Sequence, residues 1–443
     1  MRLVYLAAGA GGMYCGACLH ANTLAAALQH AGQDVLLVPV YTPLRIDEED
    51  VSTGRVVFGG VNVYLQQVSA VFRHTPRFVD KLLDHPALLK RLARRGSTVR
   101  PEGLGAMCVS VLRGEEGRQR KEVEKTVRWL EEIRPEVVHL STVLLAGMAR
   151  EIRRRLGVPV VATLSGEDTF LDRLPEPYRA EARQVLRQRA GELEGLIALS
   201  RYYADFMAEY LAVDRRRIHV IPPGLNLEGH APAGPPQRAS TADDSSAPQV
   251  TIGCLGRVCE DKGLHLLAEA LELLVRDARH PGIRVLAAGH LAEADRPYLE
   301  QIMARLRAKG LADRFQYVGQ VDRAEKIAFL QSLDVVSLPA IVPESKGLPV
   351  LEAWANGVPA VLPGHGAFVE LVEDTGGGLL HQPGDAVALA AALGELIRDP
   401  ARAAELGRRA QQAVFDRYHA ALMARRTIAL YEQVLRGASG GSR

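Results

Sequence analysis

Short apolar runs alternate with amphipathic helical repeats along most of this chain, and this alternation limits the folds open to it. The first example has an apolar run at 2–7, a glycine-rich turn at 9–12, helical spacing over 19–31 and a second apolar run at 35–40. A strand, a helix and a second strand in this order form a βαβ unit, in which parallel strands are covered by helices. The sequence therefore predicts the α/β class.

The alternation occurs in two series, separated by a segment of different composition. Residues 228–249 are rich in Pro, Ala, Ser and Asp and lack apolar periodicity, which is typical of a linker or surface loop. Further strands are expected at 137–140, 159–164, 195–199 and 218–221 before this segment, and at 250–255, 284–288, 315–318, 335–338 and 359–362 after it. Helices are expected at 144–156, 178–193, 202–211, 264–277, 298–309, 323–331 and 349–356. Two Rossmann-like domains are predicted, at 1–227 and 250–418, facing a central cleft, with a disordered tail at 437–443.

Charge and cysteine usage exclude several classes of protein. The formal net charge is +2, which does not favour a nucleic-acid binder. No run of about 20 apolar residues predicts a membrane span, and 3–7 is too short for the core of a secretory signal. Five cysteines in a chain of 443 residues do not suggest a disulfide framework, so a cytoplasmic location is predicted. Cys15 and Cys18 form a C-x-x-C without a second pair for zinc, and we expect small residues lining a tight loop.

The segment 73–128 is locally basic and carries apolar residues at helical spacing. One interpretation is a weak contact with a membrane surface, which would make the protein peripheral at the inner membrane face. The alternative, which we favour, is a set of helices that pack their apolar side on the first domain.

Two groups of residues have a spacing that suits a phosphorylated sugar ligand. Arg257 and Lys262 lie in a loop directly after the strand 250–255, and two fixed cations there suit a diphosphate. Glu344 and Glu352 flank the start of a predicted helix, and carboxylates are good acceptors for sugar or ribose hydroxyls. Taken alone, Arg257 and Lys262 are better explained as solvated surface charges, and the two glutamates as acidic residues near the first turns of a routine helix.

In this order, the motifs resemble the retaining glycosyltransferases of family 4, which have the GT-B fold. The resemblance covers nearly the whole chain and is most specific at 256–263 and in PESKGLPVLEAWANGVPAV at 343–361; IHVIPPGLN at 218–226 and VATLSGED at 161–168 also match. It implies that a final helix at 419–436 crosses back to the first domain. It also implies transfer of a sugar from a nucleoside-diphosphate sugar to an acceptor hydroxyl with retention of configuration, and a hexosyl group as the sugar.

The resemblance also implies a role for each matching residue. Arg257 and Lys262 would neutralise the donor diphosphate, Glu344 would hold the transferred sugar and Glu352 the ribose. The remaining expected contacts are Gly11, Gly12, Gly347 and Leu348 near the phosphates, Val318 near the base, and Ser165, Glu167 and Asp168 on the acceptor side. Neither a metal ion nor another cofactor is expected, because Arg257 and Lys262 would take the place of a metal.

This sequence departs from the family pattern in places. Ser165 stands where a histidine is common, and Ser345-Lys346 replaces a glycine and an aromatic residue. The acceptor, which could be a glycan, a lipid-linked sugar or a small molecule, and the donor sugar therefore stay open. Alternative functions are a nucleotide-sugar epimerase or a phosphorylase of the same fold, or a non-catalytic nucleotide-sugar-binding module.

Overall fold

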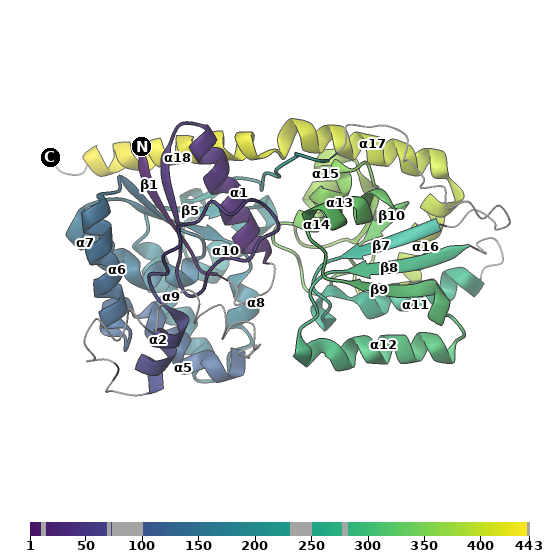
Figure 1. Ribbon diagram of the computed structural model, residues 1–443, viewed down its shortest axis with the longest axis horizontal. Helices are drawn as coiled ribbons and strands as arrows, with labels where there is room; N and C mark the ends of the chain where they lie inside the picture. Colours follow the sequence, from purple (N-terminus) through teal and green to yellow (C-terminus); the bar gives the residue numbers. More distant parts are fainter. Residues whose placement is uncertain (10–14, 69–71, 73–100, 231–249, 277–281, 441–443) are drawn as a thin grey trace. The chain divides into compact units, whose positions relative to one another are not determined.

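The computed structural model describes residues 1–9, 15–68, 72, 101–230, 250–276 and 282–440 (Figure 1). They form two compact units: unit 1 is Met1–Gly224 together with Ala420–Arg443, and unit 2 is Leu225–His419. Each unit contains one six-stranded sheet, in which the paired strands run parallel. The prediction of an α/β protein with two Rossmann-like domains is confirmed.

Unit 1 has the strand order β2-β1-β3-β4-β5-β6. These strands are β1 Arg2–Ala7, β2 Asp34–Pro39, β3 Val137–Leu140, β4 Val160–Leu164, β5 Gly195–Ala198 and β6 Ile218–Val220. Its helices are α1 Gly16–His30, α2 Gly60–Val68, α5 Pro101–Leu112, α6 Arg120–Ile133, α7 Ala149–Leu156, α8 Glu167–Leu171, α9 Tyr178–Gly191, α10 Arg201–Leu211 and α18 Ala420–Gly440. The C-terminal helix α18 thus belongs to unit 1, where it packs against α1.

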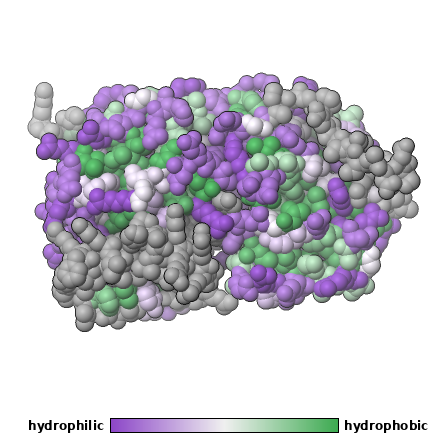
Figure 2. All heavy atoms as spheres, in the orientation of Figure 1, coloured by the Kyte–Doolittle hydropathy of each residue, from purple (hydrophilic) through white to green (hydrophobic). Residues whose placement is uncertain are grey.

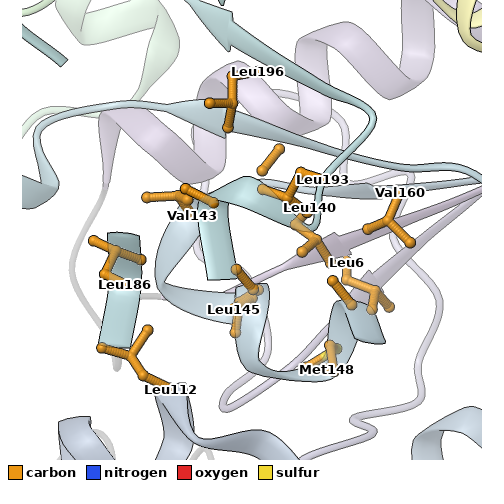
Figure 3. Close-up of a cluster of buried hydrophobic side chains, with 14 of the residues drawn as sticks. Leu6, Leu112, Leu140, Val143, Leu145, Met148, Val160, Leu186, Leu193 and Leu196 are labelled. Carbon is orange, nitrogen blue, oxygen red and sulfur yellow. The ribbon is translucent and has the colours of Figure 1, made fainter. Parts of the chain in front are cut away.

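Alternate residues of β1 enter two different cores, because successive side chains of a strand point to opposite faces of a sheet. Leu3 and Tyr5 belong to the core that α1 and α18 cover, whereas Val4 and Leu6 belong to the larger core on the other face. Figure 3 shows part of this larger core, to which strands and helices contribute leucines such as Leu6, Leu140 and Leu186. Burial on both faces explains why these strands read as continuous apolar runs.

The favoured interpretation of the basic segment 73–128 is confirmed where the structure describes it. Helix α5 contributes Val109 and Leu112 to the larger core, and α6 contributes Val127 and Leu130. The charged side chains of α6 pair locally, as Arg120 does with Glu124 at 2.8 Å. Residues 73–100 lie outside the described residues.

Unit 2 has the strand order β12-β11-β10-β7-β8-β9. These strands are β7 Val250–Leu255, β8 Ile283–Ala288, β9 Phe315–Gly319, β10 Val335–Ser337, β11 Ala360–Pro363 and β12 Gly378–His381. Its helices are α11 Leu264–Arg276, α12 Arg296–Ala308, α13 Arg323–Gln331, α14 Leu348–Ala355, α15 Ala367–Thr375, α16 Ala386–Arg398 and α17 Pro400–Arg417. Strand β12 and helices α15 to α17 were not predicted.

One prediction about the C-terminus is wrong. The sequence suggested a disordered tail from Gly437, but α18 continues to Gly440. The apolar side of this helix, including Leu430, Tyr431 and Val434, packs on the core of unit 1. Adding residues to an existing helix costs little, because each gains a backbone hydrogen bond without a new nucleus. Packing of the preceding turns therefore extends the helix into a polar sequence.

A buried polar cluster joins α18 to the sheet of unit 1. The ring of His139, on β3, stacks on Tyr5 with ring centroids 4.2 Å apart. Its Nδ1 lies 2.7 Å from the Tyr431 hydroxyl and its Nε2 lies 2.8 Å from Thr163 Oγ1, so both ring nitrogens have partners. Burial lowers the pKa of His139 to about 3, aided by the nearby His20. The imidazole is therefore neutral in the folded protein at physiological pH.

Because of this cluster, the protein should lose stability as the pH falls from 7 to 5. The unfolded chain takes up a proton at His139 near its ordinary pKa of 6.5, whereas the folded chain does not until about pH 3. This group alone should lower the free energy of unfolding by about 2 kcal/mol at pH 5. Urea unfolding of His139→Gln should show a shallower pH dependence over this range than the wild type. The exposed His30→Gln is the control, and equal slopes in all three proteins would contradict the assignment.

The described surface mixes polar and apolar side chains, and Figure 2 shows hydrophilic residues interspersed with apolar ones on one face. Single large apolar side chains are exposed, among them Val318 and Ile341, which are 38% and 42% exposed. Within the described residues, no helix has the length and apolar character that crossing a membrane requires.

Candidate active site

The predicted phosphate loop follows β7 and is held by close backbone contacts. Gly289 has φ +136, and a Cβ there would lie 1.9 Å from the carbonyl oxygen of Gly256. The N–H of Val258 donates to the carbonyl of His290 at 2.9 Å, which joins the ends of β7 and β8. Arg257 stands between these contacts and is exposed to solvent. The loop backbone is thus fixed while the guanidinium is accessible to a ligand.

Lys262 ends a short 3-10 turn, Glu260–Lys262, in the same loop. Gly263 follows with φ +68, and a Cβ there would lie 1.9 Å from the carbonyl oxygen of Pro339. The N–H of Ile341 also donates to the carbonyl of Asp261 at 2.8 Å. These contacts attach the phosphate loop to the segment that follows β10, where Glu344 lies.

Lys262 and Glu344 form an ion pair across these two loops, with Nζ donating to Oε1. Their side chains are 22% and 16% exposed, so the pair is partly desolvated but reachable from solvent. Opposite charges attract more strongly there than at a fully exposed site. The structure therefore brings together a cation and a carboxylate that the sequence places 82 residues apart.

The charged residues of this site shift the pKa values of two neighbouring groups, Cys259 and His365. Burial raises the pKa of the Cys259 thiol, and the charges of Arg257 and Lys262 oppose that rise. Burial lowers the pKa of His365, and the carboxylate of Glu344 acts in the opposite direction. Both cations therefore act on the phosphate loop, and His365 lies within electrostatic range of Glu344.

The loop before α15 supports Glu344 from its other side. The N–H of Ala367 donates to the carbonyl of Glu344 at 2.8 Å. Gly366 has φ +64, and a Cβ there would lie 2.7 Å from the Glu344 nitrogen. His365 precedes this glycine and bonds through Nε2 to the Ala340 carbonyl at 3.1 Å. His365 was not among the predicted site residues, since a lone histidine in a glycine-containing loop gives no distinct sequence signal.

Helix α14 begins at Leu348, shortly after Glu344 in the chain. Gly347 is its N-cap residue with φ +66, and no side chain caps the amides of the first turn. Leu348 opens the helix and is 5% exposed. The N-terminus of a helix favours an anion through its unbonded N–H groups and its dipole. Gly347 and Leu348 thus lie where a phosphate or sugar oxygen can meet backbone amides.

Glu352 lies further along α14 and is buried with an opposite charge. Its Oε1 accepts from Nζ of Lys326, on α13, at 2.5 Å, and the two side chains are 9% and 8% exposed. Lys326 was not predicted as a site residue, because one lysine in an amphipathic helix resembles a solvated charge. Only the packing of α13 beside α14 reveals that Lys326 neutralises Glu352 and holds its carboxylate in one place.

Val318 is the penultimate residue of the edge strand β9. Its exposed side chain could contact the face of a base. Gly11 and Gly12, expected near the donor phosphates, lie outside the described residues. The contact of Gly11 and Gly12 with the donor phosphates therefore stays a prediction.

The predicted acceptor-side residues lie in unit 1, at the end of β4 and in α8. Glu167 is 4% exposed, and its carboxylate accepts hydrogen bonds from Thr142 Oγ1 at 2.8 Å and from the Ser165 N–H at 2.8 Å. Further donors are the Gly166 N–H at 3.1 Å, the Ser165 hydroxyl at 3.3 Å and the Tyr203 hydroxyl at 3.2 Å. These contacts order the loop, so they suit an organising carboxylate better than one that touches an acceptor.

Asp168 is more accessible than Glu167. Its Oδ1 accepts from the Tyr203 hydroxyl at 2.6 Å, and that hydroxyl in turn accepts from the Gly166 N–H at 2.9 Å. Burial raises the pKa of Tyr203 well above its ordinary value, aided by the charges of Glu167 and Asp168. Tyr203 therefore remains a proton donor that orients Asp168. It is another residue that the sequence did not indicate, because α10 contributes it from a distance of 35 residues.

Two known families match different parts of this chain. Residues 241–413 match the family described as "Glycosyl transferases group 1", and residues 107–228 match "Glycosyltransferase Family 4". The first match contains Arg257, Lys262, Glu344 and Glu352, and the second contains the acceptor-side loop.

Similar proteins agree with these matches. A 2-deoxystreptamine glucosyltransferase of Streptomyces kanamyceticus is 30% identical over 313 residues, which are 67% of this chain and 77% of the relative. Sucrose-phosphate synthase of Thermosynechococcus elongatus has a similar structure, with a TM-score of 0.71 at 19% identity, covering 99% of this chain and 100% of the other. HepE of Anabaena, solved in complex with UDP-glucose, has a TM-score of 0.64 at 17% identity, covering 99% and 100%.

The two units thus correspond to the two Rossmann-like domains of the GT-B architecture. The Lys262–Glu344 and Lys326–Glu352 pairs lie in the part that matches the group 1 transferases. The chain belongs to the family 4 glycosyltransferases, and it is an enzyme that transfers a glycosyl group from a nucleotide sugar.

Proposed function

We propose that the enzyme is a retaining hexosyltransferase that uses a nucleoside-diphosphate hexose and an acceptor hydroxyl. The observation that carries this proposal is the Lys262–Glu344 pair, because it holds a diphosphate-binding cation beside a carboxylate able to accept sugar hydroxyls. When the donor binds, its phosphates compete with Glu344 for Lys262. Glu344 is then released to accept hydrogen bonds from the hydroxyls of the hexose.

The proposed reaction breaks the bond between the anomeric carbon and the diphosphate oxygen. The acceptor oxygen forms its new bond on the face from which the diphosphate leaves, so the configuration is retained. The acceptor proton passes to the departing phosphate oxygen. Arg257 and Lys262 stabilise the charge that develops on the diphosphate, together with the amides of Gly347 and Leu348. In this proposal no metal ion and no other cofactor takes part.

Glu352 and Lys326 act together on the nucleoside in this proposal. Glu352 accepts hydrogen bonds from the ribose hydroxyls, and the ion pair with Lys326 holds its carboxylate in place. Val318 contacts the base. On the acceptor side, Asp168 contacts the hydroxyl-bearing substrate, while Glu167 and Ser165 shape the loop around it.

The class of acceptor is also a proposal, with a glycan, a lipid-linked sugar or a small hydroxylated molecule as candidates. The name of the Streptomyces kanamyceticus relative gives 2-deoxystreptamine as its acceptor, which favours small polyhydroxylated acceptors as the first to test. We further propose that the enzyme works in the cytoplasm, with peripheral contact at the inner membrane face as the alternative for a lipid-linked acceptor. Thermal shifts with a panel of nucleotide sugars would identify the donor, since saturation at 100 times Kd stabilises by about 2.7 kcal/mol.

Glu344→Gln should damage turnover more than binding of the free nucleoside diphosphate. The amide keeps the size of the side chain but loses the negative charge that accepts from sugar hydroxyls, which is worth about 1.5–3 kcal/mol. We expect kcat/KM for the intact donor to fall at least tenfold. Calorimetry should give a Kd for the nucleoside diphosphate that is no weaker than in the wild type, because the variant loses the charge that competes with the phosphates for Lys262. Glu373→Gln, an exposed glutamate of α15, is the matched control. Equal losses of affinity for donor and nucleoside diphosphate would contradict contact with the transferred sugar.

A further inference from the structure

The C-x-x-C pair occupies the start of helix α1 rather than the loop that the sequence suggested. Cys15 is the N-cap residue, with extended backbone angles of φ −123 and ψ 125. Its carbonyl accepts the first helical hydrogen bond, from the Leu19 N–H at 2.9 Å. Cys18 stands three residues further on, within the first turn. Cys18 is the N3 residue, and the side chain of an N-cap residue approaches the N3 position, as it does in a capping box, so the two side chains lie near one another at the start of α1.

The two thiols differ in accessibility. Cys18 is 4% exposed and belongs to the core of unit 1 with Leu3 and Tyr5. Cys15 is only partly buried, and it packs against the edge of that same core. The residues between them are Gly16, which is exposed, and Ala17, which is partly exposed. Cys15 is therefore the more accessible of the two thiols.

The electrostatic surroundings favour a reactive thiolate at Cys15. Helix α1 has no side-chain hydrogen bond at its N-cap and no acidic residue in its first turn. The amides of that turn therefore present their partial positive charge to the N-cap side chain without competition from a carboxylate. A helix N-terminus is the environment in which one cysteine of a C-x-x-C pair becomes a nucleophile.

We propose that Cys15 and Cys18 are a redox modification site that closes to an intrachain disulfide with low-molecular-weight disulfides. The Cys15 thiolate attacks one sulfur of the oxidant, forms a mixed disulfide and releases one thiolate. The Cys18 thiol then loses its proton and attacks the Cys15 sulfur, which forms the Cys15–Cys18 bond and releases the second thiolate. Two electrons pass from the pair to the oxidant, which is reduced to two thiols.

The position of Cys15 makes closure feasible. Neighbours on a regular helix have Cβ atoms about 5–6 Å apart, whereas a disulfide needs about 3.5–4.5 Å. Cys15 lies outside the regular helix, so its own torsions can supply the difference while the inner turns of α1 keep their hydrogen bonds. A zinc site is the other use of such a pair, but among the residues that the structure describes, no three His, Cys, Asp or Glu side chains gather as metal ligands.

The test uses the full-length protein in glutathione buffers of graded redox potential, quenched by alkylation and digested with trypsin. The tryptic peptide 3–45 contains both cysteines of the pair and no other. Under oxidising conditions it should become lighter by two hydrogen atoms and carry neither alkyl group nor glutathione. Cys108, Cys254 and Cys259 are internal controls that should remain unmodified in the native protein, because burial raises the pKa of each thiol.

Two variants separate the roles of the cysteines. Cys18→Ala, which suits a buried apolar site, should trap glutathione on Cys15, and Cys15→Ser should leave Cys18 unmodified. The proposal is overturned if wild-type protein retains glutathione on Cys15 without closing the disulfide, or if Cys18→Ala is not glutathionylated. Modification of the three control cysteines at the same rate would also overturn it. Circular dichroism of both variants verifies that these outcomes refer to folded protein.

Discussion

Replacing Lys262 by alanine is expected to reduce turnover at saturating donor by about 100-fold or more. Bond cleavage leaves additional negative charge on the diphosphate, and a preorganised group that stabilises such charge contributes about 2.7–4 kcal/mol. Because each 1.36 kcal/mol changes a rate about tenfold, this contribution corresponds to about two to three orders of magnitude in turnover. Donor saturation matters, since it separates the chemical step from weaker binding.

The ion pair between Lys262 and Glu344 must be considered when the Lys262→Ala variant is interpreted. Alanine at this position also leaves Glu344 without its cation, so a double variant is needed to isolate the effect on the leaving group. Lys262→Ala combined with Glu344→Gln should be no less impaired than Lys262→Ala alone if the lysine acts on the diphosphate. Recovery of the double variant to the level of Glu344→Gln alone would mean that the loss in Lys262→Ala came from the orphaned carboxylate.

Two controls complete the test of Lys262. Lys309→Ala removes an exposed lysine at the end of α12 and should leave turnover unchanged. Arg257→Lys should be harmful although it keeps the charge, because it loses the planar fork that binds phosphate oxygens. Wild-type turnover should survive excess EDTA. If chelation abolishes activity, magnesium or manganese restores it and Lys262→Ala is nearly silent, the proposed charge stabilisation is wrong.

Replacing Glu352 by alanine is expected to affect both stability and donor binding. It removes the partner of Lys326, whose side chain is only 8% exposed. Breaking a buried ion pair from one side typically costs about 3–5 kcal/mol, because the remaining charge stays desolvated. Urea unfolding should detect this loss in unit 2. Calorimetry should show nucleoside diphosphate binding weakened by about 1.5–3 kcal/mol, the value of hydrogen bonds to a charged acceptor.

The two effects can be separated by replacing both members of the pair. Lys326→Met with Glu352→Leu fills the same space without charge and should recover most of the stability, since such apolar replacements are often neutral or stabilising. The double variant should still bind nucleotide poorly. Normal nucleotide affinity in this folded double variant would reject the ribose role of Glu352, whatever the stability of the single variant. Glu373→Ala is the exposed control.

The pattern of apolar residues predicted most of the framework that holds the site. Strands buried on both faces read as continuous apolar runs, so β1, β3 and β7 agree with their predicted bounds. Helices α15 to α17 were not predicted, because the sequence beyond 362 has no distinct motif or strand signal to bound them. Helices α16 and α17 nevertheless contribute apolar residues to the core of unit 2.

The sequence predicted the charged residues of the candidate site but not the residues that contact them. Arg257, Lys262, Glu344 and Glu352 were predicted from their spacing and from the resemblance to a family. The structure places the first three in loops of unit 2 and Glu352 within helix α14. Their partners were not found. Lys326, His365 and Tyr203 resemble ordinary members of helices and loops in the sequence, because a local pattern carries no information about a contact made across 25 to 35 residues.

The sequence by itself determined the periodicities, the glycine positions and the charges. The periodicities sufficed for the α/β class, and the charges together with the resemblance to a family sufficed to propose the main donor-site residues. Periodicity reports which side of an element is apolar, and that is a local property. Only the tertiary structure decided that Lys262 pairs with Glu344, that Lys326 neutralises Glu352, and that Glu167 is occupied by five hydrogen-bond contacts within its own loop and with its neighbours. The structure also decided that Cys15 and Cys18 stand at the start of α1, where no side chain caps the helix. The C-x-x-C spacing alone did not show this. Such pairings depend on how strands are ordered and loops juxtaposed, which no single segment of the chain encodes.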